Sequence, residues 1–338
     1  MLKEISADEL YDDKFDLIID ARSPKEYKES HIPTSHNLYA LNDEEHHEIG
    51  EMYVQQSKQD AKILGASYIC NNVSNHLKWL NKNVKIGSKI GIYCARGGLR
   101  STSIATILSL ADYRVYKVNR GYKEYRQYVL NYIENFEHQN FIALGGNTGC
   151  GKSELIQKLS PSIDLEGLAN HFGSTFGLMN GNQPNQKAFQ NNLVFKLQNI
   201  NPKYFIFIEA ESKKIGSIIQ PDLLYKRIQS GIRVEITAPI QQRVERILKD
   251  YINIDDEYFY KSMNTITPYI KKSAKLDAIE HYKKGNLDIV AEILLVDYYD
   301  KVYRKPNKID YVISNEDENS ALAELKSIAE KFNSIDIA

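Results

Sequence analysis

The chain lacks the features that would tie it to a membrane or to a disulfide framework. Its 338 residues contain no run of about 20 consecutive apolar residues, the length that a membrane-spanning helix needs. No apolar signal-peptide core follows Met1, and acidic residues come early instead. Only three cysteines are present, widely spaced, which argues against a disulfide framework and forms no zinc pattern. These absences predict a cytoplasmic protein with free thiols and no membrane association.

An excess of charge of one sign is also lacking. The 43 basic and 44 acidic residues leave a formal net charge of -1, so total charge gives no footprint for nucleic acid. A local basic surface remains compatible with this balance, because electrostatic steering depends on how charge is distributed. With 42% hydrophobic and 26% charged residues, the composition is that of a globular protein long enough for two domains.

The first part of the chain alternates strand-like and helix-like stretches. Strand-like stretches lie at residues 16–20, 89–93 and 114–118, with helix-like apolar spacing between them at 75–80 and 101–110. Such alternation predicts a parallel sheet wrapped by helices. A helix rich in Tyr, Glu, Lys and Arg is expected at 122–138, leading into a second domain.

The alternation restarts at Asn140. We predict strands at 141–144, 204–208 and 232–236, a glycine loop with a helix at about 151–159, and a largely helical region beyond Pro239. The expected fold class is therefore α/β. A parallel-sheet domain spans residues 1–130, and a second α/β domain with a helical C-terminal region spans residues 131–338.

Cys94 stands where a predicted strand ends and a helix begins. The residues that follow it are Ala95, Arg96, Gly97, Gly98, Leu99 and Arg100. The glycines allow a tight turn with inward N–H groups, and such a nest at a helix N-terminus binds an oxyanion and favours a thiolate. Arg100 can close this cradle with a bidentate fork. We expect Cys94 to be the catalytic thiol, and the anion-binding loop to consist of Arg96, Gly97, Gly98 and Arg100.

The N-terminal domain resembles a rhodanese domain. The resemblance rests on the stretch from Asp20 to Tyr27, on the triplet His31–Pro33, and on the spacing of the Cys94 loop. It implies a rhodanese-like fold for residues 1–130. Many sulfurtransferase loops are one residue shorter, and the Cys-x5-Arg form also occurs in phosphatases, where it encloses phosphate. We therefore hypothesise that the ligand is a phosphate-bearing chalcogen donor.

A phosphate-binding loop opens the second domain, which is therefore expected to be P-loop NTPase-like. Its residues match G-x-x-x-x-G-K-[ST] between a strand and a helix: Gly146, Asn147, Thr148, Gly149, Cys150, Gly151, Lys152 and Ser153. Backbone N–H groups would wrap phosphates, Lys152 would neutralise the terminal phosphate, and Ser153 could ligate Mg²⁺. Glu209 is the best-placed Walker-B carboxylate. The motif leaves open whether the loop holds a nucleotide or an isoprenyl diphosphate.

A rhodanese loop followed by a P-loop resembles the bacterial tRNA 2-selenouridine synthase family. Similar stretches extend over nearly the whole chain, and the most distinctive is residues 164–177. From this resemblance we expect a substrate site that includes Asp164, Glu166, His171, Ser174 and Glu209. The chain departs from the family pattern at Phe172, where an Arg is usual, and at Ala210, where an acidic residue is usual.

The resemblance implies a transferase that replaces sulfur by selenium at wobble 2-thiouridine, in tRNAs with Lys, Glu and Gln type anticodons. It implies selenophosphate as donor, geranyl diphosphate as co-substrate and an S-geranylated intermediate. Alkylation converts the thione sulfur, a poor leaving group, into a thiol that can depart. The P-loop would then hold geranyl diphosphate or a related phosphate. Cys94 would deliver selenium, either as a perselenide or by attacking the base, and both roles need an activated thiolate.

A tRNA surface must be local in this nearly neutral chain. Basic residues lie among Tyr251, Tyr258, Tyr260, Tyr269 and Tyr282, which suits phosphate contacts and base stacking. We expect tRNA contacts from Arg243, Arg246, Lys271, Lys272 and Lys275. Composition alone supports equally a solvated helical face with core tyrosines. The pair His46-His47, among glutamates, lacks metal-ligand spacing and predicts a polar loop.

Three other functions stay open on the sequence. One is a persulfide sulfurtransferase fused to a P-loop kinase or NTPase, which would hydrolyse nucleotide without tRNA. A phosphatase would need a general acid, and the sequence reveals none. A non-catalytic RNA-binding protein would tolerate a degenerate thiol loop, whereas Cys94, Gly97, Gly98 and Arg100 are intact.

Overall fold

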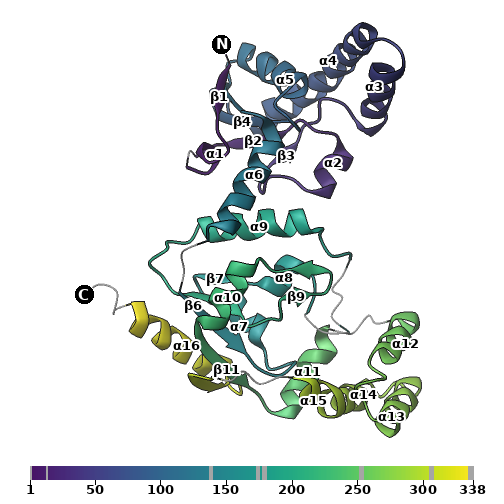
Figure 1. Ribbon diagram of the computed structural model, residues 1–338, viewed down its shortest axis with the longest axis vertical. Coiled ribbons are helices and arrows are strands. Elements are labelled where there is room, and N and C mark those ends of the chain that lie inside the picture. The colour runs from purple at the N-terminus through teal and green to yellow at the C-terminus, as the bar shows by residue number, and fades with distance from the viewer. Residues whose placement is uncertain are drawn as a thin grey trace. The chain divides into compact units, whose positions relative to one another are not determined.

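The computed structural model describes residues 2–12, 14–136, 140–172, 176, 181–250, 255–303 and 308–333. The chain forms two compact units, each built on its own parallel sheet (Figure 1). Unit 1 comprises Met1–Asn135 and Pro184–Phe195, and unit 2 comprises Phe136–Gln183 and Lys196–Ala338. The predicted α/β class is confirmed. No helix among the described residues combines the length and the apolar character that crossing a bilayer requires.

Unit 1 contains a five-stranded sheet of order β1-β5-β4-β2-β3, in which all pairs are parallel. Alternate strand residues face opposite sides: Ile90 and Ile92 pack with side chains of α4 and α5, whereas Tyr93 and Val118 pack with α1 and α6. The elements are β1 (Lys3–Ile5), α1 (Glu9–Asp12), β2 (Leu17–Asp20), α2 (Pro24–Glu29), β3 (His36–Asn37), α3 (Asp43–Gln55), α4 (Lys58–Asn83), β4 (Lys89–Tyr93), α5 (Leu99–Leu110), β5 (Arg114–Val118) and α6 (Gly121–Glu134). The carboxyl ends of parallel strands lie at the same edge of a sheet, and Cys94 follows β4 at this edge.

The segment before the thiol strand differs from the prediction. His46 and His47 lie in helix α3, not in a polar loop. Asn42 starts this helix with a capping box, in which its side chain accepts the amide of Glu45 and the Glu45 carboxylate accepts the amide of Asn42. Because α3 has no buried residue, apolar periodicity gives no signal for it. The helix predicted at 75–80 is the end of the 26-residue α4.

Unit 2 contains a parallel sheet of order β12-β11-β6-β8-β7 and a short antiparallel ribbon, β9-β10. Helices α7 and α16 pack against it through Leu155, Ile156 and Leu325. The elements are β6 (Phe141–Gly145), α7 (Lys152–Lys158), β7 (Ser162–Ile163), α8 (Leu165–Ala169), β8 (Ile206–Glu209), β9 (Lys214–Ile215), β10 (Ile218–Ile219), α10 (Asp222–Ser230), β11 (Ile232–Thr237), β12 (Tyr311–Ser314) and α16 (Glu318–Asn333).

The helical C-terminal region of unit 2 has a core of its own, which includes Phe259, Met263, Leu295 and Tyr299. Its elements are α11 (Ile240–Asp250), α12 (Asp256–Thr265), α13 (Lys272–Lys283), α14 (Leu287–Leu294), the π-helix η1 (Leu295–Tyr299) and α15 (Asp300–Val302). The predicted helical character beyond Pro239 is therefore observed, interrupted by β12 before α16.

Helix α9 (Gln186–Gln198) corrects the division of the chain at residue 130. The chain leaves unit 1 after Asn135 and returns to it at Pro184. The reason is visible at Asn191, which is buried and whose side-chain amide donates to the Tyr122 hydroxyl (2.9 Å) and to the His31 carbonyl (2.8 Å). A buried amide needs such partners, and no local pattern in the sequence identifies them.

The start of α6 packs so tightly on the Cys94 loop that it requires glycine. Gly121 has a φ of +57°, and a Cβ there would lie 2.0 Å from the Cys94 carbonyl oxygen. We expect Gly121→Ala to lower the free energy of unfolding of unit 1 by about 2–4 kcal/mol. Fluorescence of Trp79, the single tryptophan, reports this transition in urea.

Gly50→Ala in α3 is the matched control, because a Cβ at Gly50 meets nothing within 4 Å. Helix propensity should make this variant more stable than the wild type by about 0.5–1 kcal/mol. Equal stability of the two variants would contradict the steric argument.

Candidate active sites: a thiol loop and a phosphate loop

Cys94 lies directly after β4, and 2% of its surface is exposed. Its Sγ accepts a hydrogen bond from Ser101 Oγ (3.2 Å) and lies 3.9 Å from the Gly98 carbonyl oxygen. Ser101 is fully buried in the first turn of α5. A hydroxyl that donates to sulfur stabilises the anionic form of the thiol. Ser101 is thus a functional candidate that sequence reasoning missed; a hydroxyl seven residues after the cysteine was the available signal.

The loop after Cys94 leaves backbone amides available for an anion. Within the described chain, the N–H groups of residues 95–98 donate no hydrogen bond. Gly97 has a φ of +67°, and α5 begins without a side-chain cap. The positive end of a 12-residue helix adds a favourable field for negative charge. This arrangement suits an oxyanion beside the Cys94 sulfur.

Arg100 has a partner that the sequence did not suggest. Its NH1 donates to Glu26 Oε2 (2.6 Å), which also accepts the amide of Ser23 in the capping box of α2. Burial opposes the charge of Glu26, but the hydrogen bond from Arg100 lowers the pKa of this carboxyl group. Arg100 therefore does not fork into the cradle here. Its Nε and NH2 donate no hydrogen bond among the described residues and form the edge that a bidentate contact with an oxyanion would use.

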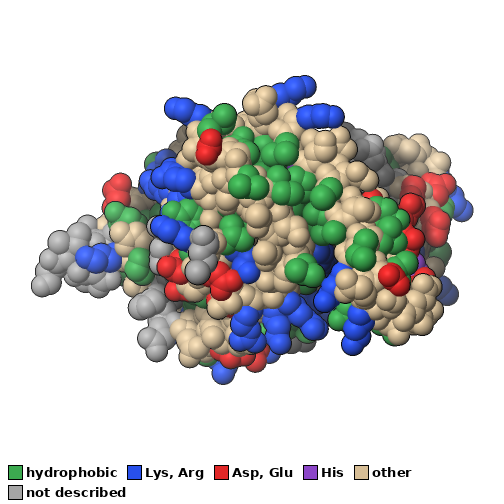
Figure 2. Space-filling model, turned by 90° about the horizontal axis from the view of Figure 1, so that it is seen from above, with side chains coloured by type: hydrophobic (Ala, Val, Ile, Leu, Met, Phe, Trp, Pro, Cys, Tyr) green, Lys and Arg blue, Asp and Glu red, His purple; other side chains and the backbone are tan. Residues whose placement is uncertain are grey.

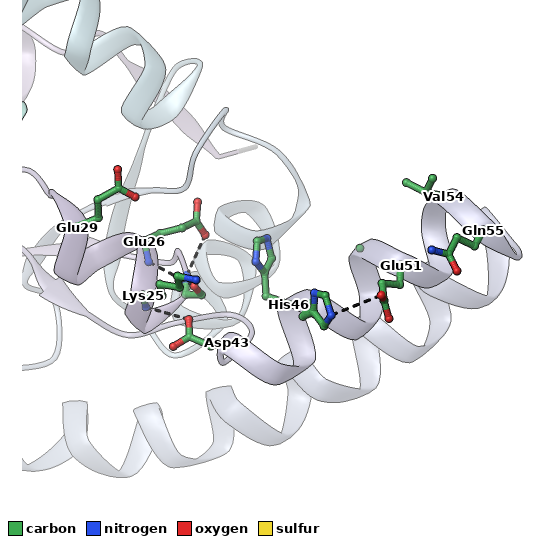
Figure 3. Close-up of a pocket in the computed structure, with 11 residues that line it drawn as sticks. Lys25, Glu26, Glu29, Asp43, His46, Glu51, Val54 and Gln55 are labelled. Atoms are coloured by element: carbon green, nitrogen blue, oxygen red, sulfur yellow. Dashed lines mark hydrogen bonds and ion pairs between the residues drawn. The ribbon is translucent and has the colours of Figure 1, made fainter.

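An acidic pocket of about 590 Å³ lies between α2 and α3 (Figure 3). Its lining includes Glu26, Glu29, Asp43 and Glu51. His46 also lines it, and burial, followed by the nearby Arg100, lowers the pKa of this imidazole. Among the residues described, no group of three or more His, Cys, Asp or Glu could hold a metal ion. The pocket therefore presents net negative charge next to Arg100.

The P-loop connects β6 to α7, as the motif predicts. Gly146, Gly149 and Gly151 have φ values of +137°, +79° and +87°. A Cβ on Gly149 would lie 2.9 Å from the backbone oxygen of Arg243, and one on Gly151 would lie 2.4 Å from Asn315 Nδ2. The motif glycines are therefore required by close packing as well as by backbone conformation.

The centre of the P-loop is organised around Lys152. Its Nζ donates to the Gly146 carbonyl (3.0 Å). Burial opposes the charge of the ammonium, but Cys150 and then Glu166 outweigh it and raise the pKa of Lys152. The N–H groups of Gly149 and Gly151 donate no hydrogen bond within the described chain. A partly buried cation with free amides around it fits a phosphate group.

Two buried carboxylates adjoin the P-loop. Ser153 Oγ donates to Glu166 Oε2 (2.7 Å), and the Glu166 amide donates to Glu209 Oε2 (2.8 Å). Glu209 Oε1 is buried and has no hydrogen-bond partner in the described structure. Burial, followed by the charge of Glu209, raises the pKa of Glu166 well above its usual value. Burial, followed by the charge of Asp164, raises the pKa of Glu209 to about 8.

The donor set around Ser153 fits Mg²⁺. This cation prefers hydroxyl and carboxylate oxygens, and the orphaned Glu209 Oε1 lies in the same cluster as Ser153 and Glu166. Lys152 is the basic residue whose charge acts on both carboxylates. A divalent cation would offset the remaining negative charge.

The other residues expected in the substrate site have different positions. Asp164 caps α8: its Oδ1 accepts the Gly167 amide (2.6 Å), and its Oδ2 accepts Gln157 Nε2 (3.1 Å). Both oxygens therefore take part in the fold, and the substrate role of Asp164 stays a prediction. The His171 amide donates to the Glu166 carbonyl (3.0 Å), and burial lowers the pKa of its imidazole. Ser174 lies outside the described residues.

Arg243 and Arg246 hold the P-loop and do not form an RNA surface, contrary to the prediction. Arg243 is 6% exposed, donates through Nε to the Thr148 carbonyl (2.9 Å), and pairs through NH1 and NH2 with both oxygens of Asp300 (3.0 and 2.6 Å). Arg246 contacts the carbonyl of Gly149 (3.3 Å) and the carboxylate of Glu154 (3.2 Å). A guanidinium occupied in this way is not available to a phosphate backbone.

Asp300 and Tyr303, just after the π-helix, are contacts of the P-loop that the sequence did not reveal. Asp300 Oδ1 accepts Asn147 Nδ2 (2.9 Å), and the Tyr303 hydroxyl accepts the Gly146 amide (2.9 Å) and donates to Glu235 (3.0 Å). A π-helix often marks a functional segment. The separation of about 150 residues in sequence hides these pairs.

The remaining basic residues lie on the helical region. Lys271 and Lys272 are exposed at the start of α13, whereas Lys275 Nζ donates to Asn264 (3.2 Å) and Thr267 (2.6 Å). Tyr282 stacks on Phe259 with ring centroids 3.6 Å apart, and Tyr260 packs beside them, so these tyrosines serve the core. Tyr269 is 63% exposed, and Tyr251 lies outside the described residues.

A parallel sheet with a thiol loop and a second parallel sheet with a P-loop define a chain that combines a rhodanese-like domain with a P-loop domain. A rhodanese-like family model matches residues 4–128, and a model described as the tRNA 2-selenouridine synthase AAA domain matches residues 139–278. The chain belongs to the tRNA 2-selenouridine synthase family.

Relatives of this name match over most of both chains. The one from Pseudomonas syringae pv. syringae is 31% identical and covers 93% of this chain and 95% of its own. That from Hydrogenovibrio crunogenus is 30% identical, covering 87% and 91%. That from Psychromonas ingrahamii is 29% identical, covering 85% and 87%.

Glu209 makes the stability of unit 2 depend on pH. Its pKa in the folded chain is raised from 4.5 to about 8, so the folded state keeps a proton that the unfolded state releases between these values. The free energy of unfolding should therefore fall as pH rises from about 5 to 8, by up to about 1.4 kcal/mol per pH unit for this group. Glu209→Gln should reduce the slope. Hydrogen exchange of peptides from β6 and β8, with chelator and corrected for intrinsic rates, measures it.

Glu257→Gln, at an exposed position of α12, is the control and should leave the slope unchanged. An unaltered slope in the Glu209→Gln variant would show that this carboxyl group is not the one that titrates.

Proposed function

We propose that the chain replaces sulfur by selenium at wobble 2-thiouridine of tRNA, through an S-geranylated intermediate. Family membership supports tRNA modification as the general activity. The observation that supports the finer proposal is that one chain has two separate helix starts without a side-chain cap, one after Cys94 and one in the P-loop. A reaction with two phosphate-bearing co-substrates, selenophosphate and geranyl diphosphate, needs two sites for anions.

The P-loop is assigned to geranyl diphosphate. The thione sulfur of the base would attack the first carbon of the geranyl group, and the carbon–oxygen bond would break with its electrons passing to diphosphate. Lys152 and the amides of Gly149 and Gly151 would stabilise the charge that develops on the leaving group. Ser153 and Glu209 would hold Mg²⁺, which would neutralise part of the diphosphate charge.

The Cys94 loop is assigned to selenium delivery. The cradle of residues 95–98 would hold the phosphate group of selenophosphate, and Arg100 would add a bidentate contact through Nε and NH2. The thiolate of Cys94 would add to C2 of the S-geranylated base, and geranylthiol would depart. The selenium atom of selenophosphate would then attack the same carbon and expel the Cys94 thiolate, and hydrolysis of the selenium–phosphorus bond would release phosphate and leave 2-selenouridine. The hydrogen bond from Ser101 stabilises this thiolate. The expected tRNAs carry Lys, Glu and Gln type anticodons.

The decisive experiment incubates the protein with 2-thiouridine tRNA, geranyl diphosphate and selenophosphate, and analyses the nucleosides by mass spectrometry. We expect Cys94→Ala to keep geranylation and to lose selenation by at least about 100-fold, because the nucleophile is removed. Lys152→Ala should lower geranylation by about 100-fold, because the leaving diphosphate loses the cation that stabilises its charge.

Cys70→Ala, which removes an exposed thiol, is the control and should leave both steps unchanged. A wild-type protein that forms neither product would end the proposal. Steady nucleotide hydrolysis without tRNA, together with thiosulfate:cyanide activity, would favour the persulfide sulfurtransferase instead.

The start of α13 is the proposed tRNA contact in unit 2. Lys271 and Lys272 place two cations at the positive end of a helix, where they oppose its dipole unless an anion is bound. We expect the double variant Lys271→Ala/Lys272→Ala to bind tRNA about tenfold more weakly and to reduce the salt slope of log Kd by about 1–2. Substitution of Lys326 and Lys331 of α16 by Ala is the matched control. Equal losses in the two double variants would contradict a specific contact.

A further inference from the structure

We infer that unit 1 carries an RNA-binding surface of its own, the basic rim of the Cys94 loop, formed by Arg96, Arg120 and Lys123. This rim would hold backbone phosphates of the tRNA on either side of the base that enters the loop. The inference rests on the proposed function, because it assumes that the reacting base comes to Cys94.

Backbone contacts bring the three residues together. Arg96 belongs to the Cys94 loop, Arg120 follows β5, and Lys123 lies in the first turn of α6. The Lys123 amide donates to the Ala95 carbonyl (3.1 Å), and a Cβ on Gly97 would lie 3.0 Å from the Arg120 nitrogen. The two segments thus touch directly beside the anion cradle.

The three cations are also available for a ligand. All are exposed, and within the described chain none forms an ion pair or a side-chain hydrogen bond. Two other cations near the loop are occupied: Arg100 pairs with Glu26, and Lys117 pairs with Glu4 (2.7 Å). Like charges held close together repel one another, and a polyanion relieves this repulsion.

Negative and positive side chains lie on different sides of the Cys94 loop. This separation of charge favours one orientation of a bound RNA. The pocket between α2 and α3 carries the carboxylates of Glu26, Glu29, Asp43 and Glu51 and would repel phosphates (Figure 3). The rim at the starts of α5 and α6 would attract them. Leu99, between Arg96 and the body of α5, is 65% exposed and offers an apolar contact for an unstacked base. Figure 2 shows one face of the molecule, on which lysine and arginine side chains and hydrophobic side chains are both exposed.

The test compares two triple variants of the full chain. The rim variant carries Arg96→Ala, Arg120→Ala and Lys123→Ala. The control carries Lys82→Ala, Lys85→Ala and Arg114→Ala, three exposed cations near the starts of β4 and β5, at the opposite edge of the sheet. Binding of 2-thiouridine tRNA is measured by fluorescence anisotropy between about 50 and 200 mM salt.

For the rim variant we expect a Kd raised about 30-fold or more and a salt slope smaller by about 2–3, since each lost phosphate contact removes about 0.7–0.9. The control should change Kd less than about twofold. Wild-type tRNA should also slow alkylation of Cys94 by iodoacetamide, and the rim variant should lose this protection. Equal effects in both triple variants, or an unchanged Kd and protection in the rim variant, would overturn the inference.

A second readout separates this inference from the proposed function. Inorganic phosphate should still protect Cys94 from alkylation in the rim variant, because the exposed Arg96 contributes its backbone N–H to the cradle and Arg96→Ala retains that group. Such protection would show that the cradle is intact. Loss of phosphate protection together with loss of tRNA binding would mean a collapsed loop and would overturn the rim as a binding surface. A wild-type protein that binds tRNA through the rim but does not transfer selenium would end the proposed function and leave the rim in place.

Discussion

A chain that passes from a parallel strand into a helix leaves the first N–H groups of that helix without partners. In most helices a side chain caps them, but neither α5 nor α7 has such a cap. Glycines with positive φ turn each loop tightly beside the strand end: Gly97 before α5, and Gly146, Gly149 and Gly151 before α7. Both candidate sites depend on this one constraint. It creates two places, one in each unit, where a buried anion finds donors already in position.

The two loops have the same arrangement of unpaired backbone N–H groups at a helix start, but they differ in the charged side chains around it. Next to Cys94, Arg100 is balanced by Glu26, and the sulfur receives a hydrogen bond from the neutral Ser101. The P-loop has a partly buried Lys152 whose charge acts on the carboxylates of Glu166 and Glu209. The first arrangement suits a nucleophile beside a single tetrahedral anion. The second suits a diphosphate with a divalent cation, because carboxylates would repel a phosphate unless a cation lay between them.

Local features of the sequence were predictable and distant pairings were not. The thiol loop, the P-loop and the strands β4, β5 and β6 each depend on a short stretch whose apolar pattern or glycine spacing is explicit. Arg243 is an example of a distant pairing. A basic residue in an amphipathic helix is predicted to lie on the surface, but Arg243 pairs with Asp300, 57 positions further along the chain. The Glu26–Arg100 pair, separated by 74 residues, is hidden for the same reason. Helix α3 was not predicted because it has no buried apolar face that would produce a helical pattern in the sequence.

The location of RNA contacts follows from pairing rather than from composition. Four of the cations that border the two candidate sites, Arg243, Arg246, Arg100 and Lys117, each pair with a carboxylate. Such residues have already lost hydration and conformational freedom to a partner in the fold, so they add little to binding an external phosphate. Arg96, Arg120 and Lys123 have no such partner in the described chain and border the candidate thiol site. The cations left unpaired by the fold are therefore the ones that a polyanionic substrate can still neutralise, and their position beside Cys94 is where the proposed reaction requires that substrate to be.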